Sequence, residues 1–124
     1  MNQTVRFFLY WLILNIIGFN LGSLHGSTNN GFIPLAIGGY PGLILGDLVF
    51  GALIGLAQYI AIRKTDFISV SLWWVAATSL GFTIGARMGS LLTFQITDDW
   101  VVAGIVFGVF MGGSIGLTTG FTLF

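Results

Sequence analysis

The chain has 124 residues, of which 56% are hydrophobic and only 6% are charged, and its formal net charge at pH 7 is zero. A soluble domain usually carries about 25% charged residues, so four basic and four acidic side chains could not cover a soluble fold. The absence of cysteine excludes disulfides and thiolate chemistry, and no basic run is long enough to bind nucleic acid. The composition therefore indicates an integral membrane protein.

Four apolar stretches are long enough to cross a bilayer. A span needs about 20 mostly apolar residues, because the hydrocarbon layer is roughly 30 Å thick and a helix rises about 1.5 Å per residue. In lipid every backbone amide must be satisfied within the protein, which favours helices over isolated strands. We therefore predict a single all-α transmembrane domain over residues 1–124, a four-helix bundle with spans at about 5–24, 42–62, 70–94 and 100–124.

The connections between these spans suggest an orientation. The first, 26–41, is long and contains an apolar stretch, Phe32–Ile37, which is expected to lie in the membrane interface or to dip back into the membrane. Lys and Arg in short loops collect on the cytoplasmic side. Arg6, Arg63 and Lys64 all fall on that side if both termini are cytoplasmic, which is the orientation we predict.

The chain resembles two tandem copies of one helical hairpin. A Trp, a Gly-Phe pair and a Gly-Ser pair recur at constant spacing in the first and third spans, and a Gly-x-x-x-Gly-Leu pattern recurs in the second and fourth. The matched residues are Trp11, Gly18, Phe19, Gly22, Gly26 and Ser27 with Trp74, Gly81, Phe82, Gly85, Gly89 and Ser90, and Gly51–Leu56 with Gly112–Leu117. Each copy crosses the membrane twice, so the two would form a parallel internal repeat about an axis along the membrane normal.

Glycines recur every fourth residue in all four spans, which places them on one face of each helix. Lipid gives apolar side chains no reason to leave it, so membrane helices associate through the close contacts that small residues allow. The fourth span has the longest such row and is expected to be the central packing helix or a self-association face. The glycines assigned to helix packing are Gly18, Gly22, Gly51, Gly55, Gly81, Gly85, Gly108, Gly112 and Gly116.

Two ionisable residues lie inside predicted spans. At 1.5 Å per residue, Asp47 lies about 7–8 Å below the outer end of the second span and Arg87 about 10 Å below that of the third. Similar depth and opposite charge predict an intramembrane ion pair between them. The pair would either fix helix register or take part in binding a ligand or an ion, and an unpaired Arg87 would instead extend to the outer interface.

The remaining polar side chains predict little chemistry. Asn20, Gln58 and Thr83 are expected to form polar contacts between helices. His25, the only histidine, is expected in a solvated loop or, as the alternative, as an axial ligand to a tetrapyrrole. The HExxH, GxSxG and P-loop motifs are absent, and His and Cys are too few for a zinc site. We therefore predict no catalytic residue, no metal site and no enzymatic activity.

Residues Gly51–Arg63 resemble a hairpin motif of uncharacterised small four-helix bacterial membrane proteins, common in cyanobacteria. Their pattern is G-x-x-x-G-x-A-Q-[WY]-x-x-x-x-R, followed by a helix that contains Trp-Trp. This chain matches through Gln58 and Tyr59, with three residues before Arg63 instead of four. The second hairpin has Thr119 where Gln58 would align. The resemblance implies a bacterial plasma or thylakoid membrane and no mechanism.

Three functions fit these features. The leading hypothesis is a non-enzymatic accessory or scaffold subunit that packs through its glycine-rich helix faces in a larger membrane complex, such as a photosynthetic or respiratory one. The alternatives are a small oligomeric channel or transporter, and a pigment- or lipid-binding membrane protein. The expected partners are membrane lipids and a larger complex or further copies of the chain. No cofactor is required, although the third hypothesis would bring a tetrapyrrole or a lipid.

Overall fold

The computed structural model describes residues 1–25 and 31–123, except the side chains of His25 and Phe94. Residues 26 and 27 of the predicted repeat, and residue 124, lie outside the described part. The described residues form helices and no strand, which confirms the predicted all-α class for this part of the chain. The elements are α1 (Gln3–His25), α2 (Phe32–Ile37), α3 (Gly39–Thr65), α4 (Trp73–Ile96), α5 (Trp100–Gly120) and a 3-10 turn, η1 (Phe121–Leu123).

Three of the long helices are long and apolar enough to cross a membrane: α1, α3, and α5 together with η1. The fourth, α4, has 24 residues and would be about 36 Å long at 1.5 Å per residue. It carries several hydroxyl residues and Arg87, and it is not among these three. Its role as a fourth span therefore stays a prediction.

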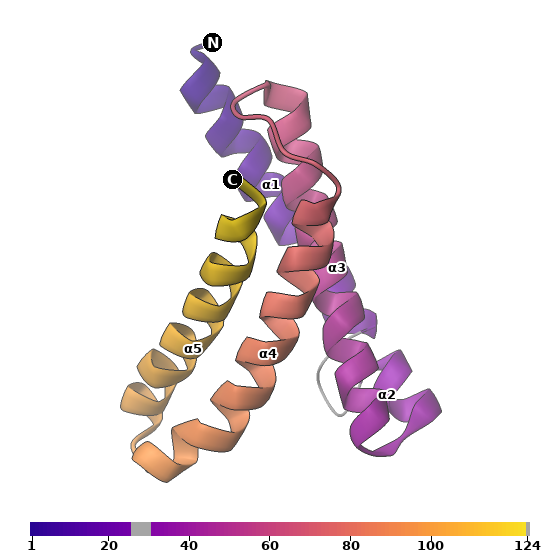
Figure 1. The fold of residues 1–124 in the computed structure, drawn as a ribbon, viewed down its shortest axis with the longest axis vertical. Coiled ribbons are helices and arrows are strands. Elements are labelled where there is room, and N and C mark those ends of the chain that lie inside the picture. The colour runs from indigo at the N-terminus through magenta and orange to yellow at the C-terminus, as the bar shows by residue number, and fades with distance from the viewer. Residues whose placement is uncertain (26–30, 124) are drawn as a thin grey trace.

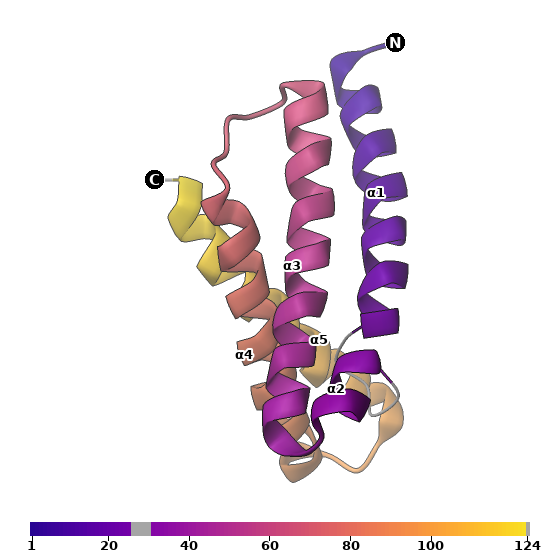
Figure 2. The same cartoon turned by 90° about the vertical axis from the view of Figure 1, so that its right-hand side faces the viewer.

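The long helices form an open row in which the backbone of each approaches only that of its neighbours. α1 packs on α3, α3 on α4 and α4 on α5, while α2 packs mainly on α3. Among the described residues, no Cα atom of α1 lies within 8 Å of one in α4 or α5, and none of α3 lies within 8 Å of one in α5. Figure 2 shows α1 and α4 on either side of α3, and Figure 1 shows α5 beside α4. The predicted bundle is therefore open, with two outer helices that each have a free side.

Glycines bring the neighbouring helices to backbone contact. A Cβ atom added to Gly51 of α3 would lie 2.7 Å from Cα of Ser79 in α4, and one added to Gly85 of α4 would lie 2.9 Å from Cα of Met111 in α5. Real Cβ atoms essentially never approach other atoms so closely, so these positions require glycine. The glycines that approach a neighbouring backbone are Gly18 of α1, Gly51 and Gly55 of α3, and Gly81 and Gly85 of α4, whereas Gly22 and Gly89 lie against the rings of Phe50 and Phe107.

The glycines of α5 behave differently. Of the two roles predicted for this helix, that of the central packing helix is wrong, and that of a self-association face stays a prediction. Within the described chain, a Cβ at any of them would meet nothing within 4 Å; these are Gly104, Gly108, Gly112, Gly113, Gly116 and Gly120. The reason is that α5 presents Phe107 and Met111 to the glycines of α4, which turns its own glycine row away from the molecule. The inner helices are α3 and α4, each with a long helix on both sides, and the α5 row faces outward.

Local sequence features set where the helices begin and end. The side chain of Asp99 accepts hydrogen bonds from the backbone N–H groups of Val101 (2.9 Å) and Val102 (3.0 Å), so it caps the start of α5. Between α2 and α3, Gly38 and Gly39 have φ values of 72° and 64°. Such positive values suit glycine because it has no Cβ, and they allow α2 to fold back onto α3.

Replacing Gly51 by Ala should destabilise the protein by about 1–3 kcal/mol, because the new methyl group overlaps the backbone of α4 and forces the helices apart. The matched control is Gly113→Ala, where the methyl group meets open space and the free energy of unfolding should stay the same or rise slightly. The measurement is unfolding in detergent, followed by tryptophan fluorescence. Equal stability of the two variants would contradict the packing role of Gly51.

Candidate functional site

The structure brings together the two ionisable residues of the predicted spans. Asp47 of α3 is fully buried, with 0% of its side chain exposed, and Nε of Arg87 in α4 lies 2.6 Å from its Oδ2 atom. Asp47 precedes Gly51 by four residues and so lies on the same face of α3, the face that α4 approaches most closely. The glycine contact therefore places α4 close enough for Arg87 to reach the carboxylate.

This ion pair holds two charges in an environment where neither is stable alone. A buried charge whose partner is removed costs several kcal/mol, while the net contribution of an intact pair is small because both groups lose their water. Charged residues within the hydrocarbon layer are subject to the same penalty. The pair therefore acts mainly by excluding other alignments of α3 and α4, since a slip along the helix axis would leave both charges without a partner.

A second polar contact joins three helices around Gln58 of α3. Its Nε2 donates to Oδ1 of Asn15 in α1 at 3.1 Å, and its Oε1 accepts from Nε1 of Trp74 in α4 at 3.2 Å. Interhelical contact was predicted for Gln58, but its partners were not. The Trp that recurs in the predicted repeat is the sequence feature that points to these partners. Trp74 is itself one partner, and Asn15, the other, lies one helical turn after the equivalent Trp11.

Asn20 and Thr83 form different bonds from those predicted. Asn20 Nδ2 donates to the Ile16 carbonyl at 2.7 Å and Thr83 Oγ1 to the Ser79 carbonyl at 2.8 Å, so both bonds stay within one helix. Short polar side chains often bond to the backbone one turn earlier. The interhelical hydroxyl bond comes instead from Ser79, whose Oγ donates to the Leu48 carbonyl of α3 at 2.6 Å.

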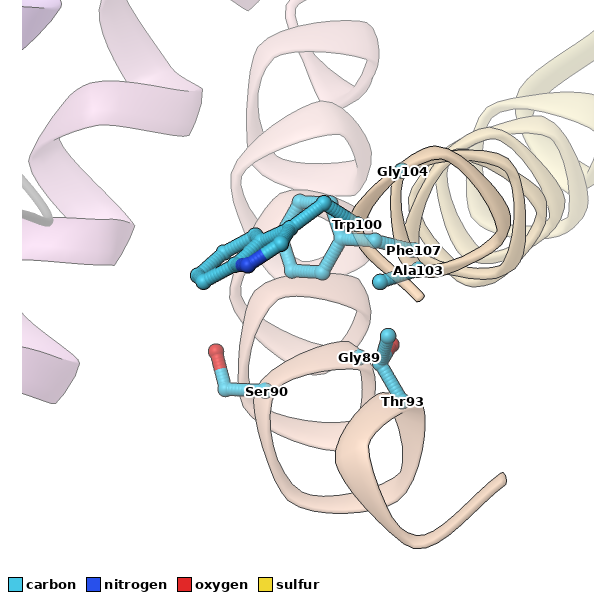
Figure 3. Close-up of a pocket in the computed structure, with 7 residues that line it drawn as sticks. All are labelled: Gly89, Ser90, Thr93, Trp100, Ala103, Gly104 and Phe107. Carbon is cyan, nitrogen blue, oxygen red and sulfur yellow. The ribbon is translucent and has the colours of Figure 1, made fainter. Parts of the chain in front are cut away.

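A pocket of about 240 Å³ opens between α4 and α5, near the turn that joins them (Figure 3). Its walls are mainly apolar and include Gly89 of α4 and Trp100 and Phe107 of α5. The Oγ1 atom of Thr93 is buried here and has no hydrogen-bond partner in the described chain. The predicted tetrapyrrole candidate, the side chain of His25, lies outside the described part.

No protein family, curated protein or solved structure matches the chain. The resemblance to small cyanobacterial membrane proteins therefore stays a prediction. Among the described residues, no group of three or more His, Cys, Asp or Glu side chains could hold a metal ion. The polar groups that do meet join helices to one another, at the Asp47–Arg87 pair and around Gln58.

Removing one member of the Asp47–Arg87 pair should lower the free energy of unfolding more than removing both members. Asp47→Asn and Arg87→Leu should each lower the free energy of unfolding by about 3–5 kcal/mol, because each leaves one buried group without its partner. The double variant should recover much of this loss, which a double-mutant cycle in detergent would measure. The control is Asp98→Asn in the exposed turn before α5. If both single variants and the double variant are as stable as the parent, the pair has no structural role.

Gln58→Leu should lower the free energy of unfolding by about 1–3 kcal/mol, since it removes two interhelical hydrogen bonds of roughly 0.6–2 kcal/mol each. Asn15→Leu should remove only one of them, and the two changes should be coupled because they share that bond. Trp74→Phe removes the other bond and keeps most of the ring. Strictly additive effects of Asn15→Leu and Gln58→Leu would show that the bond between them contributes nothing.

Proposed function

We propose that the chain is a non-enzymatic scaffold subunit that crosses the membrane four times and binds further membrane helices in a larger complex. The observation that carries this proposal is the glycine row of α5. Gly108, Gly112 and Gly116 meet no atom of the described chain within 4 Å, whereas the equivalent row of α3 is in backbone contact with α4. The α5 row has the chemistry of a helix-packing face and no helix of this chain on it.

Apolar exposure alone would not support this proposal, because lipid satisfies an apolar side chain. Glycine is different: in a soluble helix each one costs about 1 kcal/mol relative to Ala, and in lipid it offers almost no side-chain surface to pack. Close approach of a second backbone offsets that cost. A row of glycines that is unused within the chain therefore favours a membrane helix from another chain.

The arrangement of charges supports the proposed topology. The start of α1 and the end of α3 lie together, since Nη2 of Arg6 donates to the Lys64 carbonyl at 3.1 Å, and Arg63 precedes Lys64. These basic residues at one end favour cytoplasmic N- and C-termini, in a bacterial plasma or thylakoid membrane. The position of α4, between two helices apolar enough to span, supports a fourth crossing.

Two other functions are kept as alternatives because each has one supporting observation. The buried Asp47–Arg87 pair favours a small oligomeric channel or transporter, since charges within membrane helices often mark transport pathways. The pocket beside Thr93, with its unpartnered hydroxyl group, favours lipid or pigment binding. Each predicts a result that the scaffold does not. A channel or transporter should give ion or solute flux in vesicles, and a lipid- or pigment-binding protein should co-purify with a lipid or a coloured molecule.

The test is a pulldown of the tagged chain from its native membrane in mild detergent, read by native gel, mass spectrometry and absorbance. We expect a stoichiometric membrane-protein partner, which should be lost in Gly112→Leu with Gly116→Leu and retained in Gly113→Leu. The leucines fill open space, so the variant should still fold. A colourless assembly that contains only this chain would contradict the accessory-subunit proposal.

A further inference from the structure

The two hairpins make the same glycine contacts at the positions that the predicted repeat pairs. In α1–α3, Gly18 faces Ala57 and Gly22 faces Phe50; the α4–α5 contacts that correspond to them are Gly81 with Thr118 and Gly85 with Met111. Side-chain bonds follow the same pattern: Asn15 and Thr78, which are paired in the repeat, each donate to the carbonyl of the Trp four residues earlier, at 2.7 and 2.8 Å. The equivalence of positions in the two hairpins is therefore supported by their contacts as well as by their sequence.

The contact between the hairpins, α3 on α4, has no counterpart elsewhere in the chain. In it, Gly51 lies against Ser79 and Phe82, and Gly55 lies against Val75 and Thr78. The equivalents of the two glycines are Gly112 and Gly116 of α5, which meet nothing within the described chain. The glycine surface that α3 contributes to the α3–α4 contact thus has an uncovered equivalent on α5, at one end of the row.

The surface that α4 contributes to the same contact has an uncovered equivalent on α1, at the other end of the row. The residues of α1 that correspond to Val75, Ser79 and Phe82 are Leu12, Ile16 and Phe19, in that order. They are 59%, 54% and 51% exposed, so they form a largely uncovered apolar strip on α1. At the end of this strip, the ring of Phe19 also packs edge-on against Phe50 of α3, with ring centroids 5.8 Å apart. The row therefore ends in two surfaces that match the two sides of its own central contact.

We propose that a second copy of the chain binds head to tail, with its α1 seated on the α5 glycine row and Phe19 against Gly112. This inference rests on the proposed function, in which the α5 row binds a membrane helix, and it names that helix as α1 of a further copy; a different membrane protein in the complex would then bind the assembled copies. The predicted contact repeats the α3–α4 contact, so the row of helices would continue from one chain into the next.

The charged residues agree with this arrangement. In the α3–α4 contact, Asp47 faces Arg87. Their equivalents at the two ends of the row are Gly108 of α5 and Leu24 of α1, so both charges are absent together. Had only one been retained, the contact between copies would bury an unpaired charge in lipid at a high cost. Gly108 opposite Leu24 is instead a small residue facing a large one, as in the contacts that join the helices of one chain.

The head-to-tail contact differs in symmetry from the usual pairing of glycine faces. A twofold dimer would place α5 against α5 and leave the apolar strip of α1 in lipid. A heterologous contact uses both surfaces, and such contacts generate rings or open rows of several copies. The two possibilities are therefore distinguished by which residues can be cross-linked and by how many copies become joined.

The chain has no cysteine, so paired cysteines report the contact directly. The variant Phe19→Cys with Gly112→Cys should form disulfide-linked dimers and higher oligomers when its membranes are oxidised, and these should disappear on reduction. The equivalent Cβ positions in the α3–α4 contact, Gly51 and Phe82, are 2.7 Å apart, within reach of a disulfide after a small shift. The second pair is Leu12→Cys with Gly116→Cys, which tests the same face one turn away.

The matched control is Phe19→Cys with Leu117→Cys. Leu117 is 69% exposed and follows Gly116 by one residue, which turns it about 100° around the helix. The linked fraction should be about tenfold greater for the test pairs than for this control, since a seated pair has a high effective concentration. Detergent gel filtration of the reduced variants checks that each one folds.

Three results would overturn the inference. The single variant Gly112→Cys could form disulfide-linked dimers as efficiently as the cysteine pair, which would mean that two copies pair twofold through their α5 helices. The pair could form a disulfide within one chain, which would mean a closed bundle, or it could link no better than the control. If the control-level result occurs while Gly112→Leu with Gly116→Leu still loses a different membrane protein, the inference fails and the proposed function stands. If the cysteine pair forms oligomers but the pulldown contains no other protein, the inference stands and the proposed function fails.

Discussion

Backbone contact at glycine is the constraint on which the rest of this structure depends. For helices that cross a membrane, as we propose for this chain, the hydrophobic effect does not draw them together, so packing and hydrogen bonds between them must do so. The inner helix α3 meets both of its long neighbours in this way, through Gly18 of α1 on one side and through its own Gly51 and Gly55 on the other. The polar contacts follow from this approach, because short side chains can meet only where backbones are close.

The polar groups of α3 then specify which alignment of the helices is retained. Glycine rows by themselves are repetitive and would allow neighbouring helices to slip by one turn. The Asp47–Arg87 pair fits only one register, and Gln58 adds bonds to α1 and α4 at a second level. These polar groups contribute more to fixing the register of the helices than to net stability, as buried polar residues do in some other proteins.

In the proposed repeat α3 and α5 hold equivalent places, yet they have different surroundings. α3 has a helix on each side, and α5 has a helix on one side only. The same row of glycines is therefore a core feature in one hairpin and an outward face in the other. This difference links the fold to the proposed function, because the open ends of the row are the places where another helix can add contacts of the kind already present within the chain.

Hydropathy and four-residue spacing were sufficient to predict the all-α class and to place each long helix to within a few residues, because both depend on the local chain. Depth and charge likewise pointed to Asp47 and Arg87, which lie 2.6 Å apart. The sequence could not show that Gly112 faces outward while Gly51 is covered, nor that Gln58 bonds Asn15 and Trp74. A helix has several faces, and which of them is covered depends on neighbours that are distant in the chain, so only the packed structure could assign them.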